Sequence, residues 1–170
     1  IIPELVDSLL LDSIENKIIL ETQSFPLIAS AISQFNSQNT ENRSVQLYTT
    51  YRGNAYNNDN LSRKALGGIK LTYPSGFKPF YKTFDEDFVK SFIDEFGKYP
   101  NIEAIRGYDV TMDAILRTAF AKKLNKSIEL GETQYEANRF LYEENDNESY
   151  SNKAYYILEH NGYDISELKE

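Results

Sequence analysis

The sequence predicts an α/β fold, in which a parallel sheet lies between layers of helices. Its 170 residues, 41% of them hydrophobic, are enough to bury one sizeable core in a single domain. Short runs typical of strands alternate along the chain with segments of helical period. Strands separated by helices pair in parallel through right-handed crossovers. We therefore expect a three-layer parallel sheet flanked by helices, closed at its C-terminal end by a pair of strands.

The first elements are a helix, a strand and a second helix. Leu5, Leu9 and Leu10 give the first residues a helical period, and a chain that begins inside a helix is expected to be a fragment. Residues 17–21 form a short apolar run, typical of a strand buried on both faces. Pro26 opens the next helix, and its expected buried stripe is Leu27, Ile28, Ala31, Ile32 and Phe35.

Two further strands and a short helix follow, separated by loops rich in asparagine. Residues 44–49 and 69–73 alternate between apolar and polar side chains, which predicts strands. A short helix over 61–66 lies between them. The crossover pattern expected of a parallel sheet is thus repeated.

Two long amphipathic helices come next. Thr83 and Glu86 form a capping box before the first helix, and Gly97 provides its stop. Its stripe is Phe84, Phe88, Val89, Phe92, Ile93 and Phe96. The second helix, over 102–124, carries the stripe Tyr108, Met112, Ile115, Leu116, Ala119, Phe120 and Leu124. After it, residues 138–143 and 153–159 predict the closing pair of strands.

Composition excludes several classes of function. The net charge is −8, so the Lys/Arg footprint of a nucleic-acid-binding protein is missing. The absence of cysteine excludes disulfides, thiolate zinc sites and cysteine nucleophiles. No apolar run approaches the roughly 20 residues of a transmembrane helix.

No motif indicates catalysis, a metal or a cofactor. His160, the single histidine, is expected to be structural or exposed rather than a general base. The sequence lacks the acidic cluster of a phospho-receiver and the Gly-x-Ser-x-Gly motif of a serine hydrolase. We therefore predict a protein that is not an enzyme.

The order of motifs in the two long helices resembles the late part of type 1 periplasmic binding proteins, the ligand-binding fold of branched-chain amino acid receptors. The resemblance is carried by Phe88, Phe92, Phe96, Gly97 and Pro100, followed by Ala104, Gly107, Tyr108 and Asp109. Residues 17–22, 45–51 and 66–74 resemble, in order, three strands of the second lobe in that family. The Asn-, Tyr- and Lys-rich style is similar to lipoprotein or peptidoglycan-associated versions from Bacteroidota.

The resemblance implies a division of the chain between two lobes. Residues 1–100 would form the second-lobe α/β segment, residues 101–137 a crossover helix that belongs to the other lobe of the intact protein, and residues 138–170 the closing strands. Separated from that lobe, the crossover helix would expose its apolar stripe. It would then fold back or pack against another chain, for example in a homo-oligomer.

In the family a ligand lies in the cleft between the lobes, at the ends of parallel strands. The residues of this chain at those positions are Glu21, Thr22, Gln23, Ser24, Thr49, Thr50, Tyr51, Arg52, Tyr73 and Ser75. Glu21 and Arg52 would pair with a ligand amine or carboxylate, or else be solvated loop residues. Residues 49–51 would offer hydroxyls and an aromatic face, or else simply end a strand.

The implied function is an extracytoplasmic, non-catalytic solute-binding module for an amino acid-like ligand or a cell-wall fragment, presented to an ABC-type membrane transporter or envelope protein. The alternative is a ligand-free scaffold of the same fold that interacts with protein or peptidoglycan.

Overall fold

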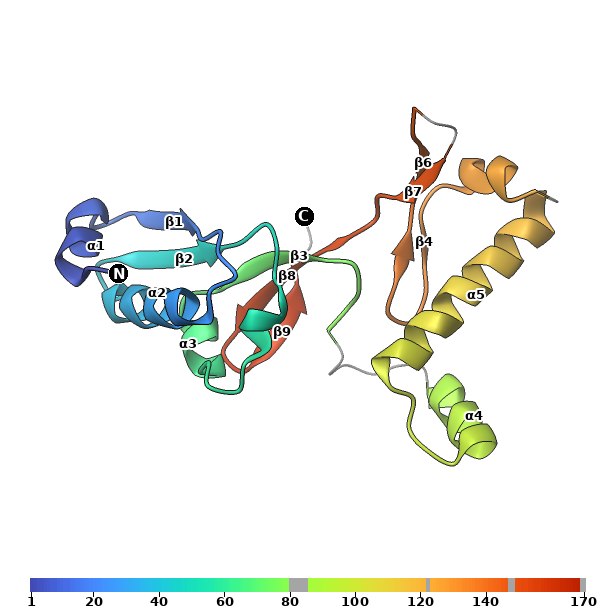
Figure 1. The fold of residues 1–170 in the computed structure, drawn as a ribbon, viewed down its shortest axis with the longest axis horizontal. Helices are drawn as coiled ribbons and strands as arrows, with labels where there is room; N and C mark the ends of the chain where they lie inside the picture. Colours follow the sequence, from blue (N-terminus) through green and yellow to red (C-terminus); the bar gives the residue numbers. More distant parts are fainter. Residues whose placement is uncertain (80–85, 122, 147–148, 169–170) are drawn as a thin grey trace. The chain divides into compact units, whose positions relative to one another are not determined.

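The computed structural model describes residues 1–79, 86–121, 123–146 and 149–168, and the chain forms two compact units (Figure 1). The sheet unit contains residues 1–75 and 157–170, and the helical unit contains residues 76–156. The chain therefore has two cores, rather than the single core that its length and composition suggest.

The sheet unit is built on five strands in the order β1-β2-β3-β8-β9. β1 pairs with β2 and β2 with β3 in parallel, whereas β8 and β9 are antiparallel. The predicted α/β class, with a mostly parallel sheet flanked by helices, is confirmed. The strands are β1 (Glu15–Ile19), β2 (Ser44–Tyr48), β3 (Thr72–Ser75), β8 (Tyr156–Asn161) and β9 (Asp164–Glu167).

The core of the sheet unit lies between α2 (Phe25–Gln38) and the sheet (Figure 1). α2 buries Ile28, Ala31, Ile32 and Phe35, as its period predicts, but Leu27 is half exposed. The shorter helices of this unit are α1 (Pro3–Leu9), the 3₁₀ helix η1 (Asn54–Asn57) and α3 (Arg63–Gly68).

Two strand predictions need correction. β1 is an edge strand, and Ile19 is 69% exposed, so the prediction of a strand buried on both faces is wrong. The third strand begins at Thr72 rather than at Ile69. Ile69 caps the C-terminus of α3, and Lys70 follows with a φ of 46°, so the chain turns there before it can extend.

The helical unit contains two long helices and two small antiparallel strand pairs. The helices are α4 (Glu86–Phe96), α5 (Ile102–Ala121) and the 3₁₀ helix η2 (Leu124–Leu130). β4 (Thr133–Gln134) pairs with β5 (Arg139–Phe140), and β6 (Tyr142–Glu144) with β7 (Tyr150–Asn152). Thr83 of the predicted capping box and Phe84 lie outside the described residues.

The predicted closing pair of strands has different partners in the structure. The first run, 138–143, contributes to β5 and β6, which pair with β4 and β7. The second run contains the start of β8, which pairs with β9. The edge is therefore closed by an antiparallel pair, but the partner strand lies after β8 rather than before it.

The inner face of α5 is polar, which the sequence analysis did not predict. At four-residue spacing α5 buries Ile105, Asp109, Asp113 and Arg117. On its outer face Tyr108, Ile115, Leu116 and Phe120 are exposed, Phe120 to 68%. Much of the apolar stripe expected for this helix is therefore exposed.

Buried charges hold the loops of the helical unit against α5. The Arg117 Nε atom donates to both carboxylate oxygens of Asp113, at 2.9 and 3.0 Å, and its Nη1 atom donates to the Ser127 carbonyl at 2.9 Å. The Asp109 carboxylate accepts from the backbone N–H groups of residues 136–138 at 2.8–3.2 Å. The polar stripe thus fixes the segment from η2 to β5.

Candidate ligand-binding site

The carboxyl ends of β1 and β2 lie at one edge of the sheet unit because the two strands are parallel. There the Glu21 carboxylate bridges to Thr50 in the loop after β2. Its Oε1 accepts from the Thr50 backbone N–H at 2.6 Å, and its Oε2 accepts from the Thr50 hydroxyl at 3.0 Å. Two of the residues predicted for the site are therefore joined by direct hydrogen bonds.

A second link joins the same two loops. The Gln23 side-chain amide donates to the Tyr51 carbonyl at 3.3 Å. A Cβ atom on Gly53 would lie 2.1 Å from the Gln23 Oε1, so a larger residue there would displace the Gln23 side chain from this position. The sequence analysis missed Gly53, although a glycine directly after a predicted strand-end cluster is a signal of close packing.

Thr22 and Ser24 form the entry to α2. The Thr22 hydroxyl accepts from the Ser24 backbone N–H at 3.2 Å, and Ser24 occupies the N-cap position with no side-chain capping bond. The first N–H groups of α2, which carry the positive end of the helix dipole, therefore lie next to Glu21 and Gln23 in the chain.

Thr49 supports the loop rather than facing solvent. It is buried, and its hydroxyl donates to the Tyr51 carbonyl at 3.2 Å and accepts from the Tyr51 N–H at 3.3 Å. The Tyr51 side chain is 65% exposed as a result. Of this pair, Tyr51 is accessible to a ligand and Thr49 sets its position.

Arg52 lies over the ring of Tyr73. Its guanidinium carbon lies 4.9 Å from the centroid of the Tyr73 ring, and Tyr73 is buried. Arg52 forms no ion pair with any residue that the structure describes. Tyr73 therefore orients a cation at the strand ends and does not itself face solvent. Ser75, at the end of β3, is half-buried.

His160 lies under this cluster and was not predicted to belong to it. Its ring is 5.9 Å from that of Tyr73, and its side chain is 4% exposed. Burial, together with the positive charges of Arg52 and Arg63, lowers the pKa of His160 to about 4. His160 is thus a neutral, structural residue, one of the two roles that the sequence analysis expected.

Taken together, the edge presents a held carboxylate at Glu21, a stacked guanidinium at Arg52 and an exposed ring at Tyr51. Charges of both signs on loops joined by hydrogen bonds suit a small polar ligand that itself carries both charges. Within the described ranges, no group of three or more acidic or histidine side chains is placed to hold a metal ion. None of the described helices has the length and apolar character needed to cross a membrane.

Comparison with known proteins gives one match in structure. No protein-family model matches the chain, and no curated protein matches it. It is similar to a crystal structure of an ABC transporter substrate-binding protein from Desulfitobacterium hafniense in complex with Leu, with 17% identity and a TM-score of 0.47. The match covers 90% of this chain and 43% of that one, so this chain spans less than half the length of the matched structure.

Proposed function

We propose that the chain is part of an extracytoplasmic solute-binding module, without catalytic activity, that binds a small zwitterionic ligand such as an amino acid. The observation that carries this proposal is the Glu21–Thr50 bridge beside the stacked Arg52. The Glu21 carboxylate and the Arg52 guanidinium supply opposite charges at the carboxyl ends of parallel strands, the position where open α/β sheets bind ligands.

Each residue has a separate role in this proposal. Arg52 pairs with the ligand carboxylate, since its guanidinium is oriented by Tyr73 and forms no ion pair within the described part of the chain. Glu21 accepts from the ligand amine, and Thr50 keeps its carboxylate in place. Tyr51 supplies an apolar face and a hydroxyl.

The ligand would be enclosed by a second lobe. We assign residues 1–100 to one lobe, the crossover segment 101–137 to the other lobe of an intact protein, and 138–170 to the closing strands. Residues 76–100 of the first range lie in the helical unit together with α5. The exposed stripe of α5 supports this assignment, because Ile115, Leu116 and Phe120 need a covering surface. Closure would present the loaded protein to a membrane transporter or an envelope protein.

A thermal-shift experiment tests the proposal. The protein is melted with each of a panel of amino acids and with peptidoglycan fragments. A ligand at 100 times its Kd adds about 2.7 kcal/mol to the free energy of unfolding. We expect a shift with amino acids that Arg52→Gln abolishes and that Lys17→Gln, a control at an exposed ion pair with Glu15, retains. No shift with any compound would contradict solute binding.

The α5 stripe also favours a second candidate, a ligand-free scaffold that binds protein or peptidoglycan through this face. In that case the stripe would be covered by a partner or a second copy of the chain. Sedimentation of the native protein beside a Phe120→Ser variant tests this candidate. Loss of self-association or of peptidoglycan binding in the variant, with a flat thermal-shift panel, would support the scaffold.

A further inference from the structure

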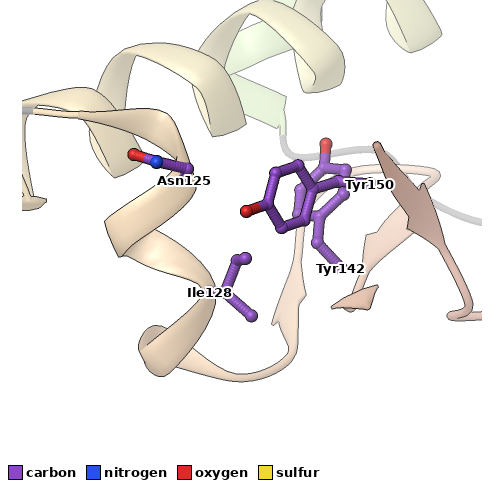
Figure 2. A pocket seen from close by; sticks show the side chains of 4 residues that line it. All are labelled: Asn125, Ile128, Tyr142 and Tyr150. Carbon is purple, nitrogen blue, oxygen red and sulfur yellow. The ribbon is translucent and has the colours of Figure 1, made fainter. Parts of the chain in front are cut away.

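The helical unit contains a pocket formed by other residues than those of the proposed solute site. Its volume is about 310 Å³, at the lower end of the range for small-molecule sites. Asn125 and Ile128 line it from η2, Tyr142 from β6 and Tyr150 from β7 (Figure 2). All four of these described lining residues belong to the helical unit.

Tyr142 forms a rigid wall of this pocket. Its ring stacks on Phe140, with centroids 6.1 Å apart, and the Arg117 guanidinium lies 4.9 Å from its centroid. Burial, followed by the charge of Asp113 and a hydrogen bond to it, raises the pKa of Tyr142 to about 12. The Tyr142 ring is therefore held before any ligand arrives.

Tyr150 completes the wall from the neighbouring strand. The pairing of Tyr142 with Asn152 and of Glu144 with Tyr150 places the two tyrosines on one face of the hairpin. Tyr150 is 39% exposed, so part of its ring is accessible from solvent. A ligand ring that enters here meets two aromatic rings and the Ile128 side chain.

The charges around the pocket indicate what it selects. None of the four described lining residues carries a formal charge. Arg117 lies beside the Tyr142 ring but is already paired with Asp113, so an ammonium group entering here would lose water without gaining an ion pair. The polar side chains of the described lining are the Asn125 amide and the two tyrosine hydroxyls. We propose that this pocket binds a neutral aromatic ring.

Indole fluorescence provides a direct test, because the protein contains no tryptophan. Indole is titrated with the full chain, and its emission is excited at a wavelength where tyrosine does not absorb. We expect saturable binding with a Kd on the order of 1 mM, ordinary for a ligand of this size. Tryptamine, which adds an ammonium group to the same ring, should bind more weakly.

Three variants locate the site. Tyr150→Ala should weaken indole binding about tenfold, the value of a lost aromatic pair. Asn125→Phe places a ring in the pocket from an exposed position of η2, and should abolish binding without loss of a core residue. Tyr155→Ala is the matched control, because Tyr155 is 59% exposed in the same unit and does not line the pocket.

The outcomes are distinct. Binding that Asn125→Phe removes and Tyr155→Ala retains supports the proposal. Absence of saturable indole binding, equal affinity in all variants, or tighter binding of tryptamine than of indole would overturn it. Neither result depends on the thermal-shift panel for the sheet unit, so the two proposals stand or fall separately.

Discussion

The two units of this chain bury different kinds of side chain at their centres. The sheet unit buries aliphatic residues of α2, β2 and α3 against each other, and Ile28, Leu47 and Ile69 have no exposed surface. The helical unit instead buries Asp109, Asp113 and Arg117 along α5. The first arrangement follows chiefly from the hydrophobic effect, although the sheet unit also buries Gln46, Thr72 and His160. The second is stable only while every buried charge keeps its partners.

The largest expected effect concerns the charged core. Arg117→Ala should destabilise the helical unit by about 3–5 kcal/mol, because Asp113 would remain as a buried, uncompensated charge. Hydrogen exchange of the α5 amides measures this loss, and amides of β2 serve as the internal reference. The double variant Asp113→Leu/Arg117→Met should recover much of the stability. A single variant as stable as the native chain would show that the cluster is not needed.

Removal of apolar volume from the aliphatic core should destabilise the sheet unit. Leu47→Ala should cost about 3 kcal/mol, the usual loss for a fully buried leucine. In this variant the β2 amides should lose protection against hydrogen exchange, whereas the α5 amides should keep it. Ile19→Ala is the control, since Ile19 is largely exposed, and should change the stability by less than about 0.5 kcal/mol. Equal losses in both units would mean that they unfold together.

Acid should act on the sheet unit through His160. Its pKa is about 4 in the folded chain against 6.5 in the unfolded chain, so the unfolded state binds more protons between these values. Stability from this group is complete above pH 6.5 and falls as the pH drops towards 4. We expect a loss of about 2 kcal/mol over this range, discounted for solvent screening. Urea titrations at pH 7 and pH 4 measure this loss of unfolding free energy. If a His160→Leu variant lost as much stability between the two pH values as the native chain, His160 would not be the cause.

The smallest effect concerns a helix cap of the sheet unit. The Ser62 hydroxyl accepts from the Ala65 N–H at 3.2 Å, and Ser62→Ala should cost about 1 kcal/mol. Ser24 occupies the same position on α2 without a side-chain bond, so Ser24→Ala should cost much less. Urea midpoints of the two variants provide the comparison. Equal losses would mean that the hydroxyl of Ser62 is not what stabilises α3.

Local patterns predicted most of the sheet unit. Pro26 and the apolar period of the following residues placed α2, and alternation placed β2. The prediction failed at Lys70, where a residue with positive φ delays the strand, and at β1, whose apolar residues lie at an edge. A run of three apolar side chains does not tell a central strand from an edge strand, since pairing depends on distant segments.

The helical unit and the candidate site were harder to predict. Helical period assigns the apolar face of α5 to the core, whereas the structure buries the Asp109–Arg117 face because residues 127–140 supply its partners. For the candidate site, Glu21 and Arg52 were predicted from their positions after the ends of strands. The contact between Tyr73 and His160 joins residues 87 positions apart, and no local motif indicates it.

The edge position of β1 also bears on the behaviour of the protein in concentrated solution. Its outer side meets no other strand in the described sheet, so its backbone groups are open to a strand from another molecule. Lys17 and Glu15 project from this strand as an exposed pair, 3.4 Å apart. Charges at such an edge discourage intermolecular pairing, so Lys17 serves as a gatekeeper against aggregation.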